Sequence, residues 1–229
     1  MLLEVIATTL QDALAAEDCG ADRIELITAI TEGGLTPSIG IIERVTDRVK
    51  IPVNVMIRPH SRTFVADDED LETMLEDINR IQDTGAAGVV LGPLTPEGTI
   101  DERVLKQLLD AAGSLDITYH RAFDEVKDQM AAYEVLCRYP QISRILTAGG
   151  TLPAPQSIPQ INRLVERSRS GGPKILAGYG LTPETILTFI RQSGVDEVHF
   201  GSSIRKGRSG LAPIDQDILR SLADELHNL

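Results

Sequence analysis

The sequence of 229 residues has only two cysteines, no long apolar run and no excess of basic charge. Cys19 and Cys137 form no CxxC or CxxH pair, which argues against a disulfide framework and a structural zinc site. No apolar run approaches membrane-spanning length, and the segment after Met1 is too short and too charged for a signal peptide, so we expect a cytoplasmic protein with no membrane partner. The net charge of −12 argues against binding to nucleic acid.

Short apolar runs alternate with longer amphipathic segments along the whole chain. Eight of the runs have the length of a β-strand and end at Gly, Pro or polar residues: 2–7, 23–27, 53–57, 87–91, 117–120, 144–148, 174–178 and 197–201. Between the runs, apolar residues recur at helical spacing, as they do at Leu71, Met74, Leu75, Ile78 and Ile81.

A short motif that begins with glycine leads into three of the predicted strands, at 20–25, 85–90 and 194–199. Glycine suits the left-handed residue that ends a helix, and the apolar run that follows starts the strand. Eight repeats of a strand followed by a helix predict an α/β fold, namely a single-domain TIM (β/α)₈ barrel over residues 1–229. An open doubly wound sheet would instead carry a glycine-rich turn after its first strand, where this chain has residues 7–10, Ala-Thr-Thr-Leu.

Ionisable residues fall near the C-terminal ends of several predicted strands, where TIM barrels build their sites. Glu4 and Glu25 have apolar neighbours on both sides, so strand alternation turns these acids toward the barrel axis. Arg58 would supply the counter-charge that buried acids need. The residues that we expect to converge near the axis are Glu4, Glu25, Asn54, Arg58, His120 and His199.

Two interpretations of this set remain open. It could be an internal salt-bridge network that only fills the barrel. It could also be a functional site. Polar groups that are costly to bury, contributed by several strands and directed at the same place, are the usual signature of a functional site. Histidine paired with carboxylate suits acid–base chemistry near neutral pH. The candidate catalytic residues are therefore Glu4, Glu25, His120 and His199.

The loops after the last three predicted strands are rich in glycine. In these barrels, exposed backbone N–H groups after the seventh and eighth strands commonly bind phosphate. The sequence therefore predicts a binding site for a small anionic ligand at Gly149, Gly178, Gly180, Gly201 and Ser202. The alternative is that the glycines only permit tight turns.

Four segments carry a resemblance to a known family: Gly-Ala-Asp-Arg-Ile-Glu-Leu at 20–26, Glu-Gly-Gly-Leu-Thr-Pro-Ser at 32–38, Met-Ile-Arg-Pro at 56–59 and His-Arg-Ala-Phe-Asp at 120–124. The chain resembles the CutC family of copper homeostasis proteins over nearly its full length. The resemblance implies a TIM barrel, a cytoplasmic location, a homo-oligomer (dimer or tetramer) and a role in copper handling. The family's characteristic polar residues correspond here to Glu4, Glu25, Arg58, His120, Arg121, Asp124 and His199. Arg58, Arg121 and Asp124 thereby join the predicted anion-binding residues.

The chain departs from the family at cysteine. Ile27 stands where many members have cysteine, and copper(I) prefers thiolate and thioether ligands. Cys19 and Cys137 fall at the ends of the first and fifth predicted helices, on opposite sides of the barrel's bottom. We therefore predict no metal ligand, and a copper ion would need His120, His199, Met56 or the acids.

Three functions are considered from the sequence, of which we favour the first, the one that the resemblance implies, and keep the second as the alternative. The first is a copper-binding homeostasis protein, and the second is an enzyme that acts on a small phosphorylated or anionic metabolite by His/Glu acid–base chemistry. The third is a non-catalytic partner that uses the barrel as a scaffold. A barrel fold does not choose among them, because barrels host many chemistries.

Overall fold

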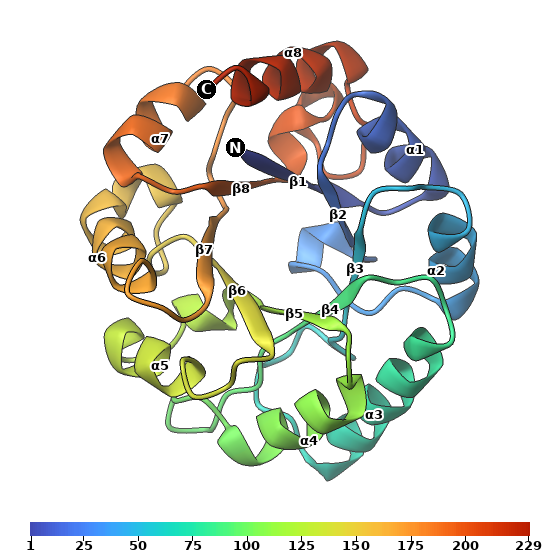
Figure 1. Ribbon diagram of the computed structural model, residues 1–229. Helices are drawn as coiled ribbons and strands as arrows, with labels where there is room; N and C mark the ends of the chain where they lie inside the picture. The colour runs from blue at the N-terminus through green and yellow to red at the C-terminus, as the bar shows by residue number, and fades with distance from the viewer.

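A computed structural model describes residues 1–229. The chain forms a closed barrel of eight parallel strands in sequential order, surrounded by helices (Figure 1). The strands are β1 (Leu2–Ala7), β2 (Arg23–Leu26), β3 (Val53–Met56), β4 (Gly88–Leu91), β5 (Asp116–Tyr119), β6 (Ile142–Thr147), β7 (Lys174–Ala177) and β8 (Glu197–Phe200). Each lies within or largely overlaps one predicted run, so the predicted TIM barrel is confirmed.

The eight main helices form the outer ring of the barrel. They are α1 (Leu10–Asp18), α2 (Ile39–Thr46), α3 (Asp68–Gln82), α4 (Glu102–Ala112), α5 (Gln129–Leu136), α6 (Ile158–Ser168), α7 (Ile186–Ser193) and α8 (Gln216–His227). α3 shows how the sequence specifies them. It begins at a capping box between Asp67 and Asp70, and it buries the apolar stripe that contains Met74 and Ile78. No helix combines the length and the apolar character needed to cross a membrane.

The barrel closes where β1 pairs with β8, so the two ends of the chain meet in one sheet (Figure 1). Leu3 and Val5 of β1 are fully buried in the core between the sheet and the helices. The alternate residue, Glu4, therefore faces the barrel interior. The strand register sets Glu4 level with His199 on β8 and with Arg23 on β2.

Charged residues fill the N-terminal half of the barrel interior. The Arg23 guanidinium bonds Glu4 through Nε and Glu197 through Nη2, the latter at 2.8 Å. Arg144 bonds Asp116 and lies 3.4 Å from Glu197, so Glu197 stands between two guanidinium groups. Because charge in an apolar interior must be paired, these contacts give the buried Glu4 and Glu197 their counter-charges.

The prediction that Arg58 supplies the counter-charge of the acids is wrong. The Arg58 guanidinium donates to the backbone carbonyls of Glu32 and Gly34, at 3.2 and 3.4 Å, and stacks over the Phe64 ring. Arg58 follows β3 at the C-terminal rim, whereas Arg23 begins β2 at the other end of the barrel. Arg23 therefore takes the role that the sequence suggested for Arg58.

The two cysteines lie where the sequence placed them, directly after α1 and α5. Figure 1 shows α1 and α5 on opposite sides of the barrel. Each sulfur lies near an arginine of its own side, with Arg220 Nη2 3.7 Å from Cys19 Sγ and Arg167 Nη2 3.7 Å from Cys137 Sγ. The two thiols cannot ligate one ion within a single chain.

We expect the substitution Arg23→Met to lower the free energy of unfolding by about 3–5 kcal/mol, because it leaves Glu4 and Glu197 buried without their shared counter-charge. Urea unfolding followed by circular dichroism at neutral pH measures this change. Arg80→Met is the control, since Arg80 forms an exposed ion pair with Glu76 on α3 and should change little. Equal effects of the two substitutions would contradict the role of Arg23.

Candidate functional site

A cleft of about 700 Å³ opens at the C-terminal ends of the strands, a size that suits a small-molecule ligand. Most of the predicted site residues line it: Glu25, Arg58, His120, Arg121, Asp124, Gly180, His199, Gly201 and Ser202. Glu4 lies beneath the cleft, and Gly149 and Gly178 are not part of its lining. The cleft thus brings together residues from distant parts of the chain.

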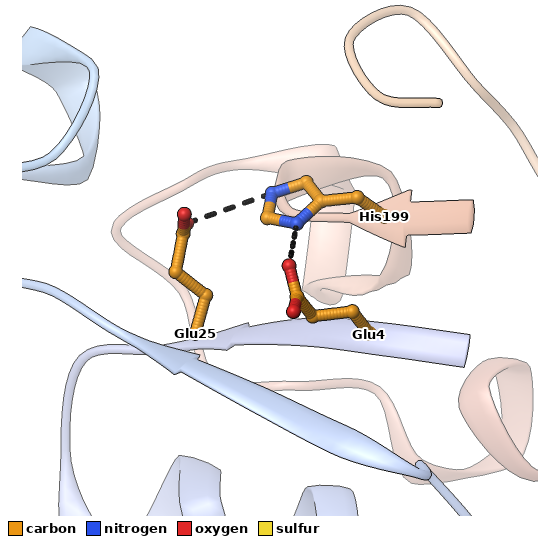
Figure 2. Close-up of side chains that lie close together, drawn as sticks. All are labelled: Glu4, Glu25 and His199. Carbon is orange, nitrogen blue, oxygen red and sulfur yellow. Dashed lines mark hydrogen bonds and ion pairs between the residues drawn. The ribbon is translucent and has the colours of Figure 1, made fainter. Parts of the chain in front are cut away.

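At the floor of the cleft, the His199 ring lies between two glutamates (Figure 2). Its Nδ1 is 2.8 Å from Glu4 Oε1, and its Nε2 is 3.6 Å from Glu25 Oε2. All three side chains are buried, and Glu25 Oε1 has no hydrogen-bond partner. The Glu4 carboxylate therefore fixes the ring, which presents Nε2 to Glu25.

The two glutamates titrate in opposite directions. Burial opposes ionisation of Glu4, but the Arg23 charge and the His199 hydrogen bond outweigh it and lower the pKa of Glu4 to about 2. Burial raises the pKa of Glu25 to about 7, although His199 partly offsets it. The pKa of His199 is raised because the two carboxylates outweigh its burial. At neutral pH, Glu4 is a fixed anion and Glu25 is poised to exchange a proton.

His120 lies across the barrel, directly after β5, and no carboxylate pairs with it. Its Nδ1 accepts a hydrogen bond from the Ala122 backbone N–H at 3.2 Å, so the ring proton of the neutral imidazole is on Nε2. Burial, followed by the nearby Arg58 charge, lowers the pKa of His120 to about 3. A side chain at Gly92 would collide with the ring, which explains why glycine stands there. His120 is thus a neutral hydrogen-bond donor at neutral pH.

Asp124 positions Arg121 at the mouth of the cleft. Its carboxylate accepts hydrogen bonds from the backbone N–H groups of Ala148 and Gly150. The same carboxylate accepts from Arg121 Nε at 2.9 Å. The Arg121 guanidinium also lies 4.2 Å from the centre of the half-exposed Tyr179 ring. Asp124 therefore acts through Arg121, and its own oxygens are engaged within the protein.

The backbone N–H groups of the loops after β6, β7 and β8 are of two kinds, bonded within the protein or free. Those of Gly149 and Gly178 donate to Thr147, through its Oγ1 and its carbonyl oxygen respectively. Three others at the cleft have no acceptor within the protein: those of Gly180, Gly201 and Ser202. Unpaired N–H groups that line a cleft are suited to binding an anion.

Glu4, Glu25 and His199 could also be considered as metal ligands, since their donor atoms lie within 4.8 Å of one another. Both Glu4 oxygens are already bonded, to Arg23 and to His199 Nδ1. Glu25 and His199 Nε2 remain, and carboxylate with imidazole is not the soft ligand set that copper(I) prefers. The donor set at this position therefore does not fit copper(I).

Tyr179 and Arg208 are among the lining residues of the cleft that were not predicted from the sequence. Tyr179 lines the cleft with φ of +71°, a strained conformation for a bulky residue. Arg208 also lines the cleft and forms an ion pair with Glu184. The glycines on both sides of Tyr179 mark its loop, but they do not reveal the strain. The sequence around Arg208 gives no comparable signal.

We expect Glu25→Gln to stabilise the protein above pH 7 and to leave it unchanged near pH 4.5. Because the pKa of Glu25 is raised from 4.5 to about 7 in the folded chain, ionisation of this carboxyl costs stability as the pH rises through that window. Glutamine removes the cost, on the order of 3 kcal/mol at high pH. Urea unfolding across this pH range measures it.

Glu4→Gln provides the opposite case. The pKa of Glu4 is lowered to about 2, so its ionisation contributes stability above pH 4.5 that is lost as the pH falls. Glu4→Gln should therefore be destabilising at neutral pH. If both substitutions changed stability in the same direction at neutral pH, the assignment of opposite roles to the two glutamates would fail.

Comparison with known proteins places this architecture in a family. The model of the CutC family matches residues 1–204. The chain is 40% identical over 198 residues to the human protein named copper homeostasis protein cutC homolog, covering 86% of this chain and 72% of that protein. It is 41% identical over 197 residues to the family protein CutC of Proteus mirabilis, covering 86% and 77% of the two chains.

Solved structures agree with this assignment. The crystal structure of CutC from Streptococcus agalactiae superposes with a TM-score of 0.82 at 33% identity, covering 87% of this chain and 97% of that one. Phosphoribosyl anthranilate isomerase from Thermococcus kodakaraensis has a TM-score of 0.64 at 15% identity, covering 99% of this chain and 98% of that one, and shares the fold alone. The family match, the sequence identities and the shared barrel together show that this chain belongs to the CutC family.

Proposed function

We propose that the cleft binds a small anionic metabolite and catalyses proton transfer on it, with Glu25 and His199 as the acid–base groups. The observation that carries the proposal is the unpartnered Oε1 of the buried Glu25, beside a histidine whose orientation Glu4 fixes. A buried carboxyl with a free oxygen is costly for stability, and such groups concentrate at sites of chemistry.

Proton transfer is most efficient when the pKa of the catalytic group lies near the working pH. The pKa of Glu25 at about 7 meets this condition, whereas that of Glu4 at about 2 does not. Glu4 instead holds His199, as a carboxylate holds the imidazole in many catalytic sites. The two glutamates thus have different tasks: Glu25 exchanges the proton, and Glu4 orients the ring.

Several groups at the mouth of the cleft favour a negatively charged ligand. Arg121 is held at the mouth by Asp124 and Tyr179, and its side chain is still 36% exposed. Arg208 lines the same cleft. The free N–H groups of Gly180, Gly201 and Ser202 point to the same class of ligand, since they can donate to phosphate or carboxylate oxygens.

Copper binding is the second candidate, because the human relative is named for copper homeostasis. In this chain a copper ion would have to use His120, His199, Met56 or the acids, all of which lie in or beneath the cleft. A part in copper homeostasis would then depend on the chemistry of the cleft and not on a thiolate site. A cytoplasmic location and a homo-oligomer, dimer or tetramer, also remain predictions.

Inorganic phosphate should stabilise the protein against heat. A ligand at 100 times its Kd adds about 2.7 kcal/mol, which for a chain of this size raises Tm by roughly 5–10 °C. Arg121→Gln should weaken phosphate binding about tenfold, because it removes a charge-assisted hydrogen bond. Arg103→Gln, on the exposed face of α4, should leave binding unchanged. A Tm that does not respond to phosphate, sulfate or sugar phosphates would overturn the anion site.

Titration with copper(I) against a competing chelator tests the second candidate. We expect the chelator to retain the metal, because the cleft offers carboxylate, imidazole and a single thioether, that of Met56. Transfer of one equivalent of copper to the protein, lost in Met56→Leu, would instead establish a copper site in the cleft. That result would count against the acid–base proposal.

A further inference from the structure

We propose that the reaction is proton transfer at the carbon next to the carbonyl group of a sugar phosphate, with Glu25 as the base and neutral His120 as the hydrogen-bond donor to the carbonyl oxygen. This inference rests on the proposed function for its base and its anion site. It adds the substrate class, a phosphorylated α-hydroxy carbonyl compound, and a catalytic task for His120.

The barrel places Glu25 and His120 on opposite walls of the same cleft. Glu25 lies on β2 and His199 on β8, the two neighbours of β1. The strand opposite β1 in a ring of eight is β5, and His120 follows it directly. Glu25, His120 and His199 all line the cleft, so a bound molecule would have the acid–base pair on one side and His120 on the other.

His120 is prepared to donate and not to accept. The Ala122 N–H occupies its Nδ1 at 3.2 Å, so the remaining proton of the neutral ring is on Nε2. The ring packs against Phe64 at 5.0 Å between centroids and fits over Gly92, where no side chain stands. The positive charges near His120 belong to Arg58 and Arg121, and they disfavour a second proton. A neutral imidazole that cannot be protonated easily is suited to stabilising a developing enolate oxygen.

The chemistry balances without any added reagent. The Glu25 carboxylate takes the proton from the carbon that bears the hydroxyl group, and the C–H electron pair becomes the C=C bond of an enediolate. The carbonyl π electrons move onto oxygen, where the His120 N–H stabilises the negative charge. Return of the proton from Glu25 to the neighbouring carbon, with transfer of the hydroxyl proton between the two oxygens, gives the isomeric sugar phosphate. No bond to phosphorus changes.

The remaining lining of the cleft fits the rest of such a substrate. Arg121 and the free N–H groups of Gly201 and Ser202 can bind the phosphate. These groups lie on the loops after β5 and β8 at the mouth, whereas Glu25 and His199 lie at the floor. A molecule with a charged end and a reactive carbonyl carbon can therefore reach both places in the cleft of about 700 Å³.

Proton NMR in D₂O tests the inference directly. The protein is incubated with aldose and ketose phosphates of three to six carbons, and the C–H signal next to each carbonyl is followed. We expect at least one compound to lose this signal through exchange with solvent deuterium. Glu25→Gln and His120→Gln should each slow the exchange by about 100-fold or more, since a general base and a hydrogen-bond donor to a developing oxyanion each contribute that much. His227→Gln is the control, because His227 lies outside the cleft and pairs with Asp22.

The outcomes separate the inference from the proposed function. If phosphate raises Tm but no sugar phosphate exchanges its C–H proton, the inference fails and the anion site stands. If neither effect is seen, both fail. Exchange that His120→Gln leaves unchanged would overturn the task given to His120. Phosphate binding, measured as the Tm shift, should persist in both Glu25→Gln and His120→Gln, which shows that the two variants fold and retain the cleft.

Discussion

The buried ion pair between Glu4 and Arg23 determines the chemistry of the whole floor of the cleft. Burial alone would favour a protonated Glu4, which could not hold the His199 ring in the same way. Arg23 keeps Glu4 ionised, and Glu4 then accepts from His199 Nδ1. The parallel pairing of β1 with both β2 and β8 sets these three residues level, so closure of the barrel creates the arrangement.

The same pair explains why two glutamates on adjacent strands have different tasks. Arg23 lies at the N-terminal end of β2 and contacts Glu4, but Glu25, two residues further on, has only the more distant His199 as a charged partner. Burial therefore decides the pKa of Glu25, and the Arg23 charge decides that of Glu4. Two carboxyls of one type become a fixed anion and a proton acceptor because of their depth in the barrel.

The sequence predicts the fold and the inward side chains well, because strand alternation and apolar runs are local properties. Glu4, Glu25 and His199 follow from that alternation. The sequence could not separate Arg23 from Arg58 as the counter-charge, since both arginines satisfy the alternation. Their depth along the barrel axis depends on the stagger between strands, which no local pattern records. Tyr179 was missed for a similar reason, because neither its positive φ nor the hydrogen bond from the Ala154 N–H to its carbonyl is recorded in a local sequence pattern.

Acid–base catalysis and metal binding at the floor of the cleft exclude each other, because both would use the Glu25 carboxylate and His199 Nε2. A cation held by Glu25 and His199 Nε2 would lower the pKa of Glu25, since positive charge favours the carboxylate. Glu25 would then no longer exchange a proton near pH 7. Conversely, the raised pKa of Glu25 follows from burial that the His199 ring, 3.6 Å away, offsets only in part, and Glu25 Oε1 has no hydrogen-bond partner. The charge balance at the floor of the cleft is therefore that of a proton acceptor, with Arg23 committed to Glu4 and Glu197 and only His199 within ion-pair distance of Glu25.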